Sequence, residues 1–386
     1  MLTCQKNLFS LPHDLHYLNG AYMSPLSKAV EAAGVRGIAQ KAVPSRIRAD
    51  DFFSQCDLAR ERFAAIVNAD PQRVAIIPAA SYGMSTVARN LNPQPGQHIV
   101  ILHEQFPSNV YPWRGFRECG VQLTTVAPSG SDERGKQWND NILEAITADT
   151  AIVALAHVHW IDGTRFDLES IGQRARDVGA ALVIDGTQSI GALPFDVQQL
   201  QPDALIVASY KWLMGPYGIG LAYYGERFDH GTPLEDNWIA RQGSEDFSRL
   251  VDYQDTYAPG AVRYDMGERS NPILIPMLVQ AMEDVLGRGV SRIQDYCTSL
   301  VRSVLPEIAD LGYRVEEEAW RASHLFGIRL PDKVSLERLN EALSQQNVMV
   351  SVRGDALRVS PNVYNDRRDM DALVQALRRG VKSSII

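Results

Sequence analysis

Short apolar runs alternate in the first two thirds of the chain with longer stretches where apolar positions recur every three to four residues. The nearly all-apolar runs are typical of strands in a parallel sheet covered on both faces. They lie at 73–77, 98–102, 151–158, 180–185 and 204–209, and a further apolar run occupies 219–224. The periodic stretches predict helices at 57–68, 81–91 and 167–179. This alternation predicts an α/β domain with right-handed crossovers.

The pattern changes after about residue 262. A long helical pattern runs from 272 to about 311, and a final helix is expected at 366–380. Between them we expect a strand within 321–330, a helix at 335–347 and a β-hairpin at 348–361 that turns at Gly354-Asp355. We therefore predict a large domain over 16–262 and a smaller α+β domain formed by 1–15 and 263–386.

Composition narrows the possible classes of protein. The 386 residues carry a net charge of −8, which argues against nucleic acid or an anionic membrane surface as a partner. No apolar stretch is long enough to span a membrane, and the first residues lack the apolar segment of a signal peptide. The four cysteines are far apart with no CxxC pair, which argues against a zinc site or disulfide framework: Cys4, Cys56, Cys119 and Cys297. We expect a soluble, cytoplasmic protein without a metal.

The string SYKWLMGPYGIG (209–220) places Lys211 at the end of a predicted buried strand. A buried ammonium is unfavourable unless it is paired or neutralised, and a Schiff base with pyridoxal phosphate (PLP) would neutralise it. The alternative is a solvated lysine in a loop. Asp185 ends the preceding predicted strand, and ligands of open parallel sheets bind at the carboxyl ends of strands. A carboxylate there could keep the PLP pyridine nitrogen protonated, although it could also cap a turn.

Two further segments suit a phosphorylated aromatic cofactor. The small-residue turn after 73–77 opens a predicted helix at Ala80 and Ser81, whose free N–H groups could bind phosphate. Phe106, after the next strand, could stack on a ring or belong to the core. The chain contains no GxxxxGK[ST] string and no GxGxxG after the first strand, which disfavours a nicotinamide-dependent dehydrogenase.

The order of these parts resembles the class V aminotransferase family of fold-type I PLP enzymes, which includes cysteine desulfurases, kynureninases and isopenicillin N epimerases. YLNGAYMSPLS (17–27) is similar to the family's opening segment, and the most specific stretch is 183–224, which holds Asp185, Gln188 and Lys211. The resemblance implies a large domain with a mainly parallel sheet sandwiched by helices, a smaller α+β C-terminal domain, PLP as cofactor and an amino acid as substrate.

The resemblance also implies roles for single residues. Lys211 would hold PLP as a Schiff base and move protons at the substrate Cα, while Asp185 would pair with the pyridine nitrogen. Gln188 would hydrogen-bond the phenolic oxygen of the ring, and Phe106 would stack on it. The phosphate would be bound by Ala80, Ser81, Tyr210 and Ser209, although Ser209 could be only a turn residue.

Arg358 is similar to the arginine that binds the substrate α-carboxylate, with a surface arginine as the alternative. Ser270 and Asn271 lie in a segment that in the family reaches across a dimer interface to the neighbour's phosphate. Trp238 could act similarly through its indole N–H or belong to the core. These residues imply a homodimer with shared active sites.

Departures from the family's patterns concern the reaction type. Many desulfurases carry a cysteine just before the substrate arginine, where this chain has VMVSVRGDALRV, and Tyr210 and Phe106 stand where desulfurases have histidines. Persulfide chemistry is therefore disfavoured. The strings FPSN, SYK and RSNP look more like kynureninases and epimerase-like members, but Asn109 replaces an acidic residue of kynureninases. Trp160 would shape the substrate side of the pocket or be core.

The expected reaction is PLP chemistry on an amino acid. We rank an aminotransferase-like reaction first, β-lyase or kynureninase-like cleavage second and epimerisation third. A non-catalytic binding module with the PLP-enzyme fold is the alternative from a different class, and the presence of Lys211 beside Asp185 argues against it.

Overall fold

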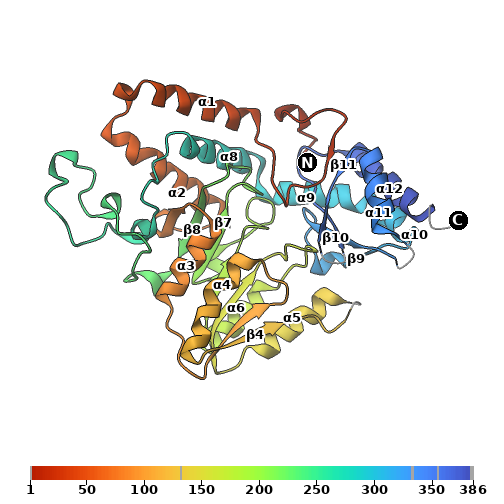
Figure 1. The fold of residues 1–386 in the computed structure, drawn as a ribbon, viewed down its shortest axis with the longest axis horizontal. Helices are drawn as coiled ribbons and strands as arrows, with labels where there is room; N and C mark the ends of the chain where they lie inside the picture. Colours follow the sequence, from red (N-terminus) through yellow and green to blue (C-terminus); the bar gives the residue numbers. More distant parts are fainter. Residues whose placement is uncertain (1, 131–132, 332–333, 354–355, 383–386) are drawn as a thin grey trace.

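The computed structural model describes residues 2–130, 133–331, 334–353 and 356–382. Its central sheet has the strand order β2-β8-β7-β6-β5-β3-β4 (Figure 1). Strand β8 is antiparallel to both of its neighbours, and the other neighbouring pairs are parallel. The strands are β2 (Val74–Ile77), β3 (His98–Leu102), β4 (Gln122–Val126), β5 (Thr150–Ala156), β6 (Ala181–Asp185), β7 (Ala204–Ala208) and β8 (Gly220–Tyr224). The predicted α/β fold with a mainly parallel sheet is confirmed.

Both faces of this central sheet are buried. Side chains alternate between the two faces, so that Leu182 and Ile184 enter one hydrophobic core while Ala181 and Val183 enter the other. The first core is covered by α2 (Ser54–Val67), α5 (Arg134–Ala145), α6 (Leu168–Asp177), α7 (Val197–Leu200) and α8 (Leu274–Arg288). The second is covered by α3 (Ala80–Asn90) and α4 (Tyr111–Arg114). Burial on both sides explains why these strands appear in the sequence as continuous apolar runs.

A separate antiparallel sheet, here called the small sheet, has the order β12-β13-β10-β9. Its strands are β9 (Arg314–Val315), β10 (Phe326–Arg329), β12 (Ser351–Arg353) and β13 (Ala356–Val359). It shares a hydrophobic core with helices α9 (Val290–Arg302), α10 (Leu305–Asp310), α11 (Leu336–Gln345) and α12 (Arg367–Lys382). The expected hairpin is present as the β12–β13 pair, and its predicted turn at Gly354-Asp355 lies outside the described residues.

The N-terminal segment joins the elements around the small sheet. Strand β1 (His16–Tyr17) pairs in parallel with β11 (Val348–Met349), and the Gln5 N–H donates to the carbonyl oxygen of Val363 at 2.7 Å. The N-terminal segment therefore lies beside β11 and α12 of the C-terminal region (Figure 1). This pairing is consistent with the expected grouping of 1–15 with the C-terminal region, which stays a prediction.

Three local expectations differ from the structure. The helical pattern at 272–311 is divided into α8, α9 and α10 because Gly289 adopts a positive φ of 80° between the first two. Strand β4 was not predicted because it lies at the sheet edge, where only Val126 is buried and three of the five residues are polar. Helix α1 (Lys28–Ala42) was also not predicted. Helix α8 packs on α1 and α2. The domain boundary at about 262 stays a prediction.

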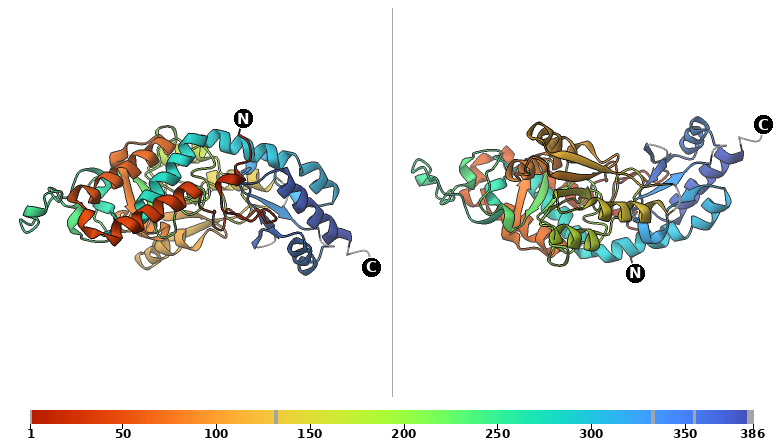
Figure 2. Two further views of the ribbon diagram at one scale, coloured as in Figure 1. Left: turned by 90° about the horizontal axis from the view of Figure 1, so that it is seen from above. Right: turned by 90° about the horizontal axis from the view of Figure 1, so that it is seen from below.

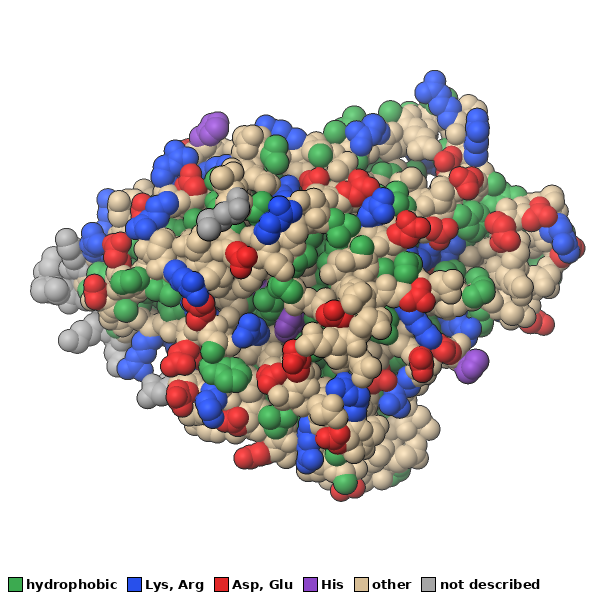
Figure 3. Space-filling model, turned by 180° about the vertical axis from the view of Figure 1, so that it is seen from behind, with side chains coloured by type: hydrophobic (Ala, Val, Ile, Leu, Met, Phe, Trp, Pro, Cys, Tyr) green, Lys and Arg blue, Asp and Glu red, His purple; other side chains and the backbone are tan. Residues whose placement is uncertain are grey.

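The segment between β8 and α8 includes an arm that projects from the body of the molecule (Figure 2). Val251 and Tyr253 of this segment are 75% and 88% exposed. Figure 3 shows acidic and basic side chains interspersed on one face of the molecule. None of the helices that the structure describes is long and apolar enough to cross a membrane.

Candidate active site

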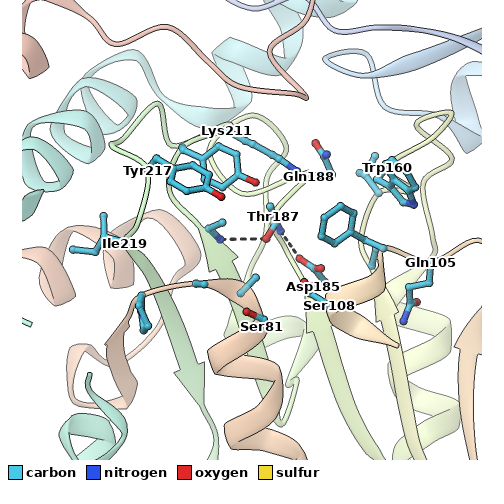
Figure 4. A pocket seen from close by; sticks show the side chains of 18 of the residues that line it. Ser81, Gln105, Ser108, Trp160, Asp185, Thr187, Gln188, Lys211, Tyr217 and Ile219 are labelled. Carbon is cyan, nitrogen blue, oxygen red and sulfur yellow. Dashed lines mark hydrogen bonds between the residues drawn. The ribbon is translucent and has the colours of Figure 1, made fainter. Parts of the chain in front are cut away.

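A cavity of about 230 Å³ lies at the carboxyl ends of β6 and β7 (Figure 4). Its walls are formed by the start of α3 and by the loops that follow β3, β5, β6 and β7. The cavity brings together eight of the residues that were selected from the sequence: Ala80, Ser81, Phe106, Trp160, Asp185, Gln188, Tyr210 and Lys211.

Lys211 lies just beyond β7 and is only 6% exposed. Its Nζ is 5.4 Å from the ring centroid of Phe106 and 5.5 Å from that of Tyr210, and it forms no ion pair with any described residue. Burial lowers the pKa of Lys211 from 10.5 to about 8; Asp185 opposes this shift, whereas Arg358 and Arg353 add to it. A substantial fraction of this amine is therefore neutral, and so nucleophilic, near physiological pH.

Asp185 is the last residue of β6, and its side chain points into the cavity (Figure 4). The Thr187 N–H donates to Oδ1 at 3.0 Å, and the Thr187 hydroxyl oxygen in turn accepts from the Ala208 N–H at 3.2 Å. Burial raises the pKa of Asp185, although Thr187 and Lys211 act in the opposite direction. Within the described part of the chain this carboxylate has no ion-pair partner. A cationic group bound in the cavity would stabilise the buried Asp185 carboxylate.

The N-terminus of α3 forms one wall of the cavity. Helix α3 begins at Ala80, and its N-cap residue, Ala79, has no side chain that could accept from the first N–H groups. The Ala80 and Ser81 N–H groups have no acceptor among the described residues, while the next N–H, of Tyr82, donates to the Ala79 carbonyl. Free N–H groups together with the positive end of the helix dipole suit a phosphate.

Gln188 and Phe106 border the remaining part of the cavity. The Gln188 amide donates to the Ala21 carbonyl oxygen at 3.1 Å, and its oxygen accepts from the Trp212 indole N–H at 2.9 Å. Trp212 therefore fixes the orientation of the amide, and one amide N–H remains for a ligand. Phe106 contacts Trp160 edge to face, with ring centroids 5.5 Å apart and an interplanar angle of 84°. This contact leaves a face of Phe106 for the cavity.

Arg358 lies on β13 and approaches Trp160 from the small sheet. It is 2% exposed, and its Nη1 donates to the Trp160 carbonyl oxygen at 2.9 Å. Its Nε has no hydrogen-bond partner, and no described carboxylate pairs with the guanidinium. Burial lowers the pKa of Arg358 to about 10, with a further contribution from Arg353. A buried guanidinium without a carboxylate is a candidate site for a bound anion.

Two residues that were selected from the sequence do not face this cavity. The Ser209 hydroxyl lies 2.7 Å from the Pro216 carbonyl oxygen and 2.8 Å from that of Ile219, so it stabilises the turn after β7. Its expected part in a phosphate site stays a prediction. The Asn109 side chain is fully buried, and its Oδ1 accepts from the Trp113 indole N–H at 2.9 Å. Asn109 therefore packs in the α4 region, and its expected contact with substrate stays a prediction.

Trp238, Ser270 and Asn271 line a second cavity of about 300 Å³, which is separate from that of Lys211. The Ser270 hydroxyl donates to the Phe52 carbonyl oxygen at 2.6 Å. Asn271 Oδ1 accepts from the N–H groups of Ile273 and Leu274 at the start of α8. Their expected role at a neighbour's phosphate therefore stays a prediction.

Some residues that line the cavity were not predicted from the sequence. Thr187, Gln105, Ser108 and Tyr217 all line the cavity. Thr187 could have been found, because it lies two residues beyond Asp185 at the same strand end. Tyr217 lies in the glycine-containing turn 215–220, where sequence alone gives no direction for a side chain. Arg353 lies on β12, and its contribution could be recognised only from the fold.

The sequence matches the profile of the family described as Aminotransferase class-V over residues 46–376. The chain belongs to the class-V aminotransferase family. It is therefore a PLP-dependent enzyme, and the family resemblance noted in the sequence is confirmed. The residues of the cavity fit this cofactor: an uncapped helix N-terminus for its phosphate, a buried carboxylate without an ion-pair partner among the described residues for its pyridine nitrogen, and a buried lysine of lowered pKa for its aldehyde.

Relatives within the class-V family differ in their described activities. An uncharacterized aminotransferase, YcbU, from Bacillus subtilis is 27% identical over 322 residues, which cover 81% of this chain and 80% of the relative. A probable cysteine desulfurase from Streptomyces coelicolor is 32% identical, with 83% and 80% covered. The fold is similar to a cysteine desulfurase from Thermococcus onnurineus, with a TM-score of 0.82, 19% identity and 99% of both chains covered. These relatives carry more than one described activity within the same fold.

Proposed function

We propose that this enzyme acts on an amino acid through Lys211 and is aminotransferase-like. The observation that carries the proposal is the convergence of Lys211, Asp185 and the start of α3 on one cavity. PLP, when bound, supplies an aldehyde for covalent attachment and an electron-withdrawing ring that stabilises negative charge at the substrate Cα.

The residues of the cavity would each perform a defined task. The free N–H groups of Ala80 and Ser81 would bind the phosphate, and Asp185 would keep the pyridine nitrogen protonated. Arg358 would bind the α-carboxylate of the substrate and so orient Cα. Lys211 is the one lysine lining the cavity in the described part of the chain, so it would remove the Cα proton and return it. Its pKa of about 8 suits both directions of transfer.

A desulfurase reaction through a protein persulfide is disfavoured. No cysteine lines the cavity in the part of the chain that the structure describes. Burial raises the pKa of the Cys56 and Cys297 thiols to about 11 and about 12, so neither is a ready nucleophile. A β-lyase or an epimerase would share the first step with an aminotransferase, because Lys211 removes the Cα proton in each. These remain the alternatives, ahead of a non-catalytic binding module.

The test begins with the absorbance spectrum of the purified protein. PLP attached to Lys211 gives a visible band that borohydride abolishes by fixing the cofactor to the chain. We expect Lys211→Ala to lack the band and Lys28→Ala, a matched exposed lysine, to retain it. Amino acids are then screened with an added 2-oxo acid. Transfer of the amino group supports the proposal, whereas release of a β-substituent or change of Cα configuration would replace it with one of the alternatives.

We also propose a cytoplasmic homodimer in which Ser270, Asn271 and Trp238 of one subunit complete the phosphate site of the other. In support, these residues line a cavity that lacks Lys211. Sedimentation of the holoenzyme tests the dimer. Weaker PLP binding by Asn271→Ala in dimers that remain intact would support shared sites, and unchanged binding would contradict them.

A further inference from the structure

A second arginine lies beside the proposed active site. Arg353 is the last residue of β12 and is half-buried. Its guanidinium carbon is 5.9 Å from the ring centroid of Trp160, a residue that lines the cavity. Its Nη1 donates to the Val352 carbonyl oxygen at 2.8 Å. No carboxylate among the described residues forms an ion pair with Arg353.

The register of the small sheet directs Arg353 and Arg358 to the same side. Arg353 on β12 lies directly opposite Ala356 on β13, and Arg358 is two residues beyond Ala356. Opposite residues of an antiparallel pair share a face, as do residues two apart on one strand. Such diagonal neighbours lie about 7–8 Å apart, within reach of long side chains. The two guanidinium groups therefore flank Trp160 from one face of the small sheet.

Both arginines act electrostatically on the same site. Each lowers the pKa of Lys211, and Arg353 also lowers that of Arg358. Two positive charges at this spacing repel each other. Asp185, the carboxylate that raises the pKa of Lys211, would pair with the cofactor and so is not available to the arginines. The proposed α-carboxylate would occupy Arg358 alone. One positive charge near the cavity then remains without an anion.

We propose that Arg353 binds a second carboxylate at the end of the substrate side chain, so that the enzyme prefers an acidic amino acid. This inference rests on the proposed function, because it assigns the α-carboxylate to Arg358. A guanidinium presents two parallel N–H groups that match the two oxygens of a carboxylate. A neutral side chain would leave Arg353 unpaired, which is the basis of discrimination.

Calorimetry on the PLP-loaded full chain tests this preference without requiring turnover. Succinate is compared with butyrate, and glutarate with valerate, so that each pair differs in one carboxylate. We expect the dicarboxylate to bind about 10- to 100-fold more tightly to the wild type, as for one charge-assisted pair. Arg353→Gln is expected to abolish the difference and Arg353→Lys to retain part of it. Arg36→Gln, at an exposed helical position, is the matched control and should retain it.

A kinetic comparison tests the same inference on substrates. The ratio of kcat/KM for L-aspartate or L-glutamate to that for L-alanine should fall about 10- to 100-fold in Arg353→Gln. Equal binding of succinate and butyrate by the wild type would overturn the inference. So would an equal loss of both ligands in the variant, because Arg353 would then serve the α-carboxylate. If the dicarboxylate preference depends on Arg353 but no amino acid reacts, the proposed function fails and the binding inference stands.

Discussion

Arg358 should destabilise the fold that holds it, because its charge is buried without a carboxylate. Burial lowers its pKa from 12.5 to about 10. At about 1.4 kcal/mol per pH unit, folding disfavours the charged guanidinium by about 3 kcal/mol. The sign follows from a basic group whose pKa is depressed in the folded state. The destabilisation is present in full below about pH 10 and disappears only as pH rises toward 12.5.

The substitution Arg358→Met keeps much of the packed stem and removes the charge. It also removes the hydrogen bond to the Trp160 carbonyl oxygen, which contributes about 1 kcal/mol. The net expectation is a stabilisation of about 2 kcal/mol at pH 7.5, or a rise in Tm of about 2 to 3 °C. Scanning calorimetry of the PLP-free protein at several scan rates measures the change, with the exposed Arg117→Met as control.

The same variant should lose binding. Butyrate and succinate should each raise the Tm of the wild type and have little effect on Arg358→Met, because the proposed anion site is gone. A variant that is less stable than the wild type would refute the reasoning, since it would show that Arg358 makes a net stabilising contribution in the fold. Retention of carboxylate binding by a stabilised variant would refute the assignment of the anion site.

Three other substitutions test the remaining electrostatics. Asp185→Asn keeps the shape but removes the charge, so PLP titrations should show weaker binding and assays a rate about 10²- to 10³-fold lower; unchanged values would exclude its role. Arg353→Gln removes a positive charge near Lys211, so the pH midpoint for acylation of Lys211 in the PLP-free protein should rise above about 8. A midpoint near 10.5 in the wild type would contradict the effect of burial on Lys211. Burial opposes the ionisation of Asp162, but His159 and Arg134 hold the pKa of its carboxyl group well below the usual range. The Arg134 Nε lies 3.2 Å from Asp162 Oδ2. Asp162→Asn should therefore destabilise the protein by about 3 kcal/mol at pH 7, and denaturant titrations should show this difference shrinking below about pH 4; a difference independent of pH would contradict the assignment.

The central part of the active site was predictable from sequence because its geometry follows from local rules. A strand buried on both faces appears as an uninterrupted apolar run, and its end is marked by the first polar residue. Asp185 and Lys211 follow two such runs, and parallel neighbouring strands bring their carboxyl ends to one edge. The same reasoning located the start of α3 near Ala80. The same reasoning did not predict the orientation of Ser209. This residue precedes Tyr210 by one position, and its hydroxyl points into the turn after β7.

The sequence by itself determined the α/β class, the family and the placement of Asp185 and Lys211 at the ends of neighbouring strands, since each depends on short-range patterns or characteristic strings. Only the tertiary structure decided that Arg358 and Arg353 approach Trp160, that Asn109 packs against Trp113 and that Ser270 faces another cavity. These contacts join segments far apart in the chain, and their geometry depends on strand register and on how the small sheet packs against the central one. Hydrophobic periodicity specifies which face of an element is buried, but it does not specify which distant side chains meet there.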